Sequence, residues 1–288
     1  MSIYRKPFVG ITAFIVVLFT MPLGHTLMVL VEKIFGEGYQ YPAATALGFS
    51  GVALLVIAFK KNEETPATWL GFFAGILIWT GWVEFSFVYF AEHLFVAPLV
   101  ENGEVVTKPE YLILPSSLGL FMATVLYFFF RRETRCNFFN WFHRNLKMGL
   151  QPTDAGRKRN FAIITATETV YILWMFYILL MIVYDNRLFG DYHPATYFVF
   201  FGSLVWSLYL FIRLIKFQKT ARAIRYAIPT VIIFWNSVEI LGRWGFFKEI
   251  WVSPLDYSLE MGLIFAAFVG VTVLTILTPE SSNSFNKN

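Results

Sequence analysis

Long runs of apolar residues alternate with short polar segments along the whole chain. A helix needs about 20 mainly apolar residues to cross the hydrocarbon core of a bilayer, because each residue adds about 1.5 Å. Eight runs qualify. They are Phe8–Val31, Tyr41–Phe59, Ala67–Phe90, Tyr111–Phe130, Phe161–Tyr184, Ala195–Ile215, Tyr226–Phe246 and Tyr257–Leu277. The pattern therefore predicts an all-α polytopic membrane protein with eight transmembrane helices.

The same landmarks occur twice, in the same order. Each half has a Phe-Gly-acid sequence, a Pro-Ala sequence, a Val-Glu pair and a Pro-Leu pair that precedes an acid and a tyrosine. They are Phe35–Glu37, Pro42–Ala44, Val83–Glu84, Pro98–Leu99 and Glu110–Tyr111, then Phe189–Asp191, Pro194–Ala195, Val238–Glu239, Pro254–Leu255 and Asp256–Tyr257. This order predicts a duplication. Because each repeat has an even number of helices, we expect two parallel four-helix repeats related by a pseudo-two-fold axis along the membrane normal.

The repeats divide the chain into four parts. Residues 1–131 form the first four-helix repeat and residues 161–278 the second, with a polar cytoplasmic tail at 279–288. The connector at 132–160 is basic and has Phe138, Phe142 and Leu146 at helical spacing, which indicates a short interfacial helix. A cytoplasmic extension of the fourth helix is the alternative.

The basic residues predict the orientation. With a cytoplasmic N-terminus, 18 of the 23 Lys and Arg residues lie on the cytoplasmic side. We therefore expect a plasma (inner) membrane protein with both termini in the cytoplasm. The basic residues are then explained by the orientation of the helices and by contact with anionic lipid, so we do not expect nucleic-acid binding.

Composition and cysteine content narrow the class further. At 57% hydrophobic residues, a soluble domain of this length would have more apolar surface than one core could bury. The single cysteine, Cys136, excludes an internal disulfide and any multi-cysteine metal cluster.

Three ionisable residues fall at one depth in the predicted bilayer. Counted from the cytoplasmic helix ends, His25, Glu84 and Glu239 lie roughly 20 to 26 Å up, and Arg243 lies one turn above Glu239. A charge at such depth costs about 2.5 to 3.5 kcal/mol, so it is usually paired or faces water. These four residues predict a polar pocket in the outer half of the bilayer.

The sequence alone does not determine which of these residues contact one another. Glu239 and Arg243 have the four-residue spacing of an intrahelical ion pair, so Arg243 could simply neutralise Glu239. Glu84 has Val88 at the equivalent position and needs a partner on another helix, a proton or water; His25 is one candidate. Whether Glu84 and Glu239 face each other is also open.

Departures from the repeat indicate that the halves have specialised. His25 corresponds to Leu179, Arg243 has no counterpart, and Glu168 stands where the first half has Phe14. Glu168 lies about 10 Å from the cytoplasmic helix end, so it is either an ion-binding residue of an inner gate or a hydrogen-bonded packing residue.

Polar residues also gather at the predicted outer helix ends. A metal site there has only weak candidates, Glu92, His93 and His193, because no two histidines have three- or four-residue spacing. Solvated polar ends are the simpler interpretation. The full set is Glu92, His93, Asp185, Asp191, His193, Glu249, Asp256 and Glu260.

Two stripes of small residues predict close helix contacts. Gly262, Ala266 and Gly270 form one stripe at four-residue spacing, and Gly71 and Gly75 start another. We interpret both as packing features and assign neither to a ligand.

Three hypotheses for function follow. The first is a transporter or channel for a proton, cation or small solute, with the intramembrane acids as binding sites. The second is a non-catalytic membrane subunit that anchors protein partners or holds a quinone or other apolar cofactor. The third is an outward-facing metal-dependent intramembrane enzyme. No catalytic residue is assigned, and the cofactor, if any, is unknown from sequence.

Overall fold

The computed structural model describes residues 7–101, 104–130, 143, 145–147 and 160–277. The predicted interfacial helix, Cys136 and the tail at 279–288 lie wholly or largely outside these residues. The described helices are α1 (Phe8–Phe59), α2 (Glu64–Ile78), α3 (Phe85–His93), α4 (Pro109–Ile113), α5 (Leu118–Phe130), α7 (Phe161–Tyr184), α8 (Pro194–Leu214), α9 (Thr220–Arg243) and α10 (Ser258–Leu277).

Eight helical spans among the described residues are long and apolar enough to cross a membrane, which confirms the predicted membrane protein. The spans are Phe8–Gly36, Gly38–Phe59, Glu64–His93, Pro109–Tyr127, Phe161–Tyr184, Pro194–Leu214, Thr220–Arg243 and Ser258–Ile276. Spans of this length and composition indicate a membrane-integral protein.

The first two spans are joined without a loop. The backbone of Gly36 adopts φ 66° and ψ −178°, and the helix reverses direction there. This positive φ favours glycine because a Cβ atom would clash with the backbone. α1 therefore has a first limb, Phe8–Gly36, and a second limb, Gly38–Phe59.

Two other spans are interrupted. The third contains α2, a π-helical segment η1 (Trp79–Glu84) and α3. The fourth, predicted as one helix, is broken into α4, a 3-10 turn η2 (Leu114–Ser117) and α5, because Pro115 cannot continue the hydrogen bonding of an α-helix.

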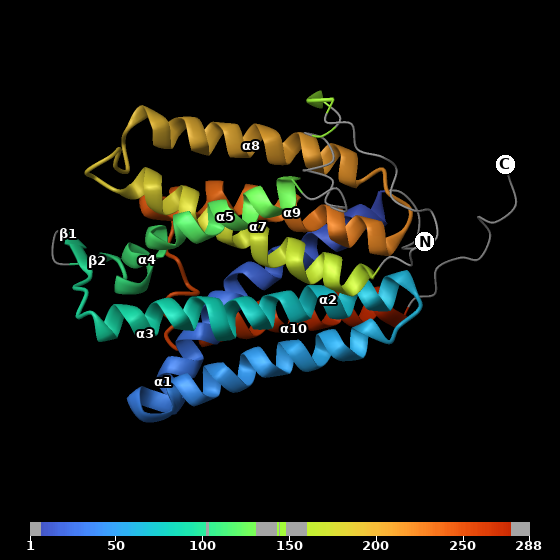
Figure 1. The fold of residues 1–288 in the computed structure, drawn as a ribbon, viewed down its shortest axis with the longest axis horizontal. Coiled ribbons are helices and arrows are strands. Elements are labelled where there is room, and N and C mark those ends of the chain that lie inside the picture. Colours follow the sequence, from blue (N-terminus) through green and yellow to red (C-terminus); the bar gives the residue numbers. More distant parts are fainter. Residues whose placement is uncertain (1–6, 102–103, 131–142, 144, 148–159, 278–288) are drawn as a thin grey trace, which may run out of the picture.

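The helical fold has one short exception among the described residues, which the sequence did not predict. Strands β1 (Leu99–Glu101) and β2 (Glu104–Thr107) form an antiparallel hairpin between α3 and α4. Figure 1 shows this hairpin at one end of the bundle, and we call that end the hairpin end. α1 begins and α10 ends at the opposite end (Figure 1).

The core lies where the first limb of α1 meets α2, α7 and α9. Its fully buried side chains include Val16, Phe72, Ile228 and Val231. α9 is the most enclosed of the described spans. In its most apolar stretch of 18 residues, 61% of the residues are buried, whereas the share is 17% for α8 and α10. In Figure 1, α8 and the second limb of α1 lie at opposite edges of the bundle.

The two small-residue stripes differ in the structure. A Cβ atom on Gly71 would stand 2.4 Å from the carbonyl oxygen of Ala162, and one on Gly75 would stand 3.0 Å from that of Ala166. These glycines let α2 approach α7 closely, as predicted. Gly262 and Gly270 have no atom within 4 Å of their built Cβ positions, so the α10 stripe packs against no described part of the chain.

Candidate functional site

His25 lies at the centre of a polar cluster to which four helices contribute. Its Nε2 atom is 2.9 Å from the Tyr177 hydroxyl oxygen and 3.4 Å from Oε1 of Glu239. Its Nδ1 atom is 3.4 Å from the Tyr111 hydroxyl oxygen. The histidine comes from α1, the tyrosines from α7 and α4, and the glutamate from α9. Both ring nitrogens of His25 therefore have polar partners inside the bundle.

Glu239 is positioned by its own helix as well as by His25. The indole nitrogen of Trp235 donates a hydrogen bond of 2.6 Å to Oε1 of Glu239. The two residues are four apart, so they lie on the same face of α9. The side chains of His25 and Glu239 are 13% and 18% exposed, and at this burial their attraction is screened less than at a protein surface.

Glu84 is the third predicted residue of the pocket. It ends the π-helical segment, is buried, and makes polar contacts with Trp79 and Thr80 of the same segment. It also lies within Coulombic range of His25. π-helical turns inside α-helices often mark functional sites, because the extra residue re-aims the side chains.

The π-helical segment packs tightly against the second limb of α1. A Cβ atom on Gly81 would stand 2.4 Å from the backbone nitrogen of Gly48. The indole nitrogen of Trp82 donates a 3.2 Å hydrogen bond to the carbonyl of Thr45 on the same limb. These contacts fix the backbone that carries Glu84.

Aromatic rings form one wall of the cluster. The ring of Tyr177 stacks on that of Tyr111, with centroids 6.1 Å apart and planes at 3°, and on that of Trp79 at 5.7 Å. Sequence reasoning missed both tyrosines. Their position inside apolar spans was a usable signal, because a buried tyrosine hydroxyl usually needs a hydrogen-bond partner.

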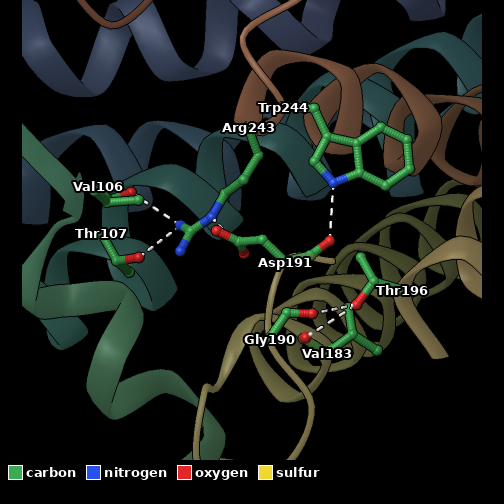
Figure 2. Close-up of polar contacts among 8 residues, drawn as sticks. All are labelled: Val106, Thr107, Val183, Gly190, Asp191, Thr196, Arg243 and Trp244. Atoms are coloured by element: carbon green, nitrogen blue, oxygen red, sulfur yellow. Dashed lines mark hydrogen bonds and ion pairs between the residues drawn. The ribbon is translucent and has the colours of Figure 1, made fainter. Parts of the chain in front are cut away.

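Arg243 does not neutralise Glu239. Figure 2 shows its guanidinium between Asp191 and the hairpin: Nε donates to Oδ1 of Asp191 at 2.8 Å, and Nη1 donates to the carbonyl of Val106 at 2.9 Å and to the hydroxyl of Thr107 at 2.7 Å. The guanidinium also lies over the ring of Tyr184, 4.6 Å from its centroid. Arg243 therefore links the hairpin to the loop before α8.

Hydrogen bonds hold that loop in place (Figure 2). The indole of Trp244 donates to the Asp191 carbonyl at 2.8 Å, and the Thr196 hydroxyl lies 2.7 Å from the carbonyl oxygen of Gly190 and 3.2 Å from that of Val183. Asp191 is thus not a solvated helix end, as the sequence suggested, but the anionic partner of a buried arginine.

Glu249 also departs from the solvated-end interpretation. It lies in the segment between α9 and α10 and is partly buried. Its carboxylate packs against the Cα atom of Gly242, where any other residue would have its Cβ atom. Burial, and then the nearby charge of Glu239, raise the pKa of Glu249 to about 7, against the opposing charges of His25 and Arg243.

The remaining predicted residues lie elsewhere. Glu168 is partly buried on α7, nine residues before Tyr177 and so about 14 Å along the helix from the cluster. Glu92 accepts hydrogen bonds from Gln40, at 3.2 Å, and from the hydroxyl of Tyr41.

The weak metal candidates have other contacts. The ring of His93 stacks on Tyr89 at 5.8 Å, and Nδ1 of His193 accepts the backbone N–H of Ala195 at 3.1 Å, which caps α8. Within the described ranges, no three His, Cys, Asp or Glu side chains are placed to hold a metal ion together.

Comparison of the chain with protein-family models, with characterised proteins and with solved structures finds no match. The evidence for function is therefore the chemistry of the site itself.

Proposed function

We propose that this membrane protein moves a proton, and that His25, Glu239 and Glu84 are its binding site inside the bundle. The contact between Nε2 of His25 and Oε1 of Glu239 carries the proposal. Histidine is the side chain whose ordinary pKa is nearest to neutral, and carboxylate-histidine relays are typical of proton pumps and transporters. A proton on His25 or on Glu239 can be exchanged across this one contact.

The surrounding groups suit a proton better than a larger solute. The tyrosine hydroxyls at both ring nitrogens of His25 can donate to a neutral ring or accept from a charged one, so they accommodate either protonation state. Glu84 lies within Coulombic range of His25, so it can act as a second proton-binding group beside the His25–Glu239 pair.

The proposal includes the parallel repeats and the orientation predicted above. Two pairs of contacts support the repeats, because each contact in the first half has a counterpart in the second half 155 residues later in the sequence. Trp82 donates to the Thr45 carbonyl, and Ser237 donates to the Phe200 carbonyl at 3.2 Å. At the same offset, the close approach of Gly81 to Gly48 corresponds to the hydrogen bond of 3.4 Å from Asn236 to Ser203.

Proton flux into liposomes that hold a pH-sensitive dye tests the proposal. We expect flux in the wild-type protein that falls by about 10²-fold or more in His25→Gln and Glu239→Gln, because each variant removes a positioned proton-carrying group. Glu260→Gln is the matched control, since Glu260 is exposed in the first turn of α10. Wild-type rates in both site variants, with normal insertion, would refute the proposal.

A membrane subunit that anchors a partner is the second candidate. The observation that favours it is a shallow aromatic groove along α8, formed by Tyr197, Phe201, Val205 and Trp206, among others. Native mass spectrometry of the gently released protein separates the candidates. Stable companion subunits or a tightly held cofactor would favour the second candidate, whereas a lone chain or homo-oligomer would favour proton movement.

A further inference from the structure

The segment between α9 and α10 folds back onto the face of α9 that carries Glu239. Its Trp251 is buried and packs on Trp235, with ring centroids 5.0 Å apart. Trp235 is the residue whose indole donates to Glu239. The segment is therefore held directly against the groups that position Glu239.

This fold places the carboxylate of Glu249 one helical turn beyond Glu239. Gly242 and Glu239 are three residues apart and so share a face of α9. A Cβ atom on Gly242 would stand 2.1 Å from Oε1 of Glu249, so the carboxylate occupies space that only glycine leaves open.

The groups that face Glu249 belong to the proton site and its surroundings. The charge of Glu249 interacts with the charges of Glu239 and Arg243 on α9 and of His25 on α1. Glu249 also lies within Coulombic range of the hydroxyl groups of Tyr177 and Tyr184 on α7. The pKa near 7 that burial and Glu239 impose means that this carboxyl gains and loses a proton around neutral pH.

We propose that Glu249 is the proton-exchange residue between the solution at the hairpin end and the His25–Glu239 pair. This inference rests on the proposed function. In the inward step, the O–H bond of protonated Glu249 breaks and the proton passes, directly or through a water molecule, to the carboxylate of Glu239. Glu249 is left as a carboxylate and takes a new proton from the solution. No electrons are transferred, and the reverse sequence releases a proton.

Two substitutions perturb this residue in different ways. Glu249→Gln removes the titrating group. Gly242→Ala keeps every titratable side chain but displaces the carboxylate of Glu249, because the added Cβ atom would occupy its position. Glu260→Gln is the matched control, since it removes an exposed carboxylate near the same end of the bundle.

The first measurement is an infrared pH titration of the carboxyl C=O stretch in the full-length protein. We expect a band that titrates near pH 7, is lost in Glu249→Gln and persists in Glu260→Gln. The midpoint should fall in Glu239→Gln, which removes a neighbouring negative charge, and should rise in His25→Gln, which removes a positive one. A band that survives Glu249→Gln, or a midpoint unmoved by both neighbouring substitutions, would overturn the inference.

The second measurement is proton flux in liposomes. We expect Glu249→Gln and Gly242→Ala to lower the flux at pH 7 by about tenfold or more. If the wild-type protein carries protons and both variants keep its rate and pH profile, the role of Glu249 is refuted and the proposed function stands. If the wild-type protein carries none, the proposed function fails, and the inference about Glu249 fails with it.

Discussion

The ion pair between Arg243 and Asp191 allows a quantitative test of how charge is neutralised at the hairpin end. Nε and Oδ1 are 2.8 Å apart, and the two side chains are only 8% and 13% exposed. At an effective dielectric constant of about 20, the gross attraction is about 6 kcal/mol, part of which the loss of hydration offsets. Removing one partner leaves a buried charge without compensation, which costs about 3–5 kcal/mol.

Two double-mutant cycles measure the effect. One combines Arg243→Gln with Asp191→Asn, and the other combines Arg243→Gln with Glu239→Gln. The free energy of unfolding is measured by SDS titration in mixed micelles, followed by circular dichroism. We expect a coupling energy of about 2–3 kcal/mol between Arg243 and Asp191, and less than about 0.5 kcal/mol between Arg243 and Glu239.

The second cycle tests the simpler interpretation of the sequence. If Arg243 served to neutralise Glu239 within α9, its coupling to Glu239 would exceed its coupling to Asp191. That result would refute the contacts in Figure 2 as the basis of stability at this end.

Three further predictions concern stability, measured by the same unfolding titration. Gly71→Ala should destabilise the protein by about 1–3 kcal/mol because the added Cβ atom meets the Ala162 backbone. The control Gly262→Ala places its Cβ atom in open space and should change stability by less than about 0.5 kcal/mol. Equal effects of the two substitutions would contradict the packing of α2 on α7. Thr196→Val should cost about 1–3 kcal/mol because the Gly190 carbonyl of the loop loses the hydroxyl that donates to it at 2.7 Å, and an unchanged value would show that the loop does not depend on this hydroxyl. The pKa of Glu249 rises from 4.5 to about 7 on folding, so the folded state binds its proton more tightly and stability should fall as pH rises across that interval. Glu249→Gln should flatten this slope, and an unchanged slope would rule out Glu249 as its cause.

Much of the candidate site could be predicted from sequence because depth in a membrane is a local property. The rise per residue of a helix and the position of its polar ends place His25, Glu84 and Glu239 at one level without any knowledge of packing. The structure then brings His25 within 3.4 Å of Glu239. Depth alone did not predict which acid His25 contacts, because that depends on the rotation of each helix about its axis.

Partners supplied by loops and by other helices could not be predicted. Arg243 has an acid four residues away on its own helix, yet it pairs with Asp191, 52 residues earlier, because the loop before α8 and the hairpin converge on it. Tyr111 contacts His25 from 86 residues away. Glu249 meets Gly242 because a nonhelical segment folds back onto α9.

The sequence by itself determined the number of apolar spans and predicted the membrane environment and a common depth for the ionisable groups, since apolar run length and helix rise are properties of each segment alone. Only the tertiary structure decided which charges meet, and that the Gly71 stripe packs while the Gly262 stripe does not. Those outcomes depend on the relative rotation and close approach of helices, which the summed packing of many side chains sets.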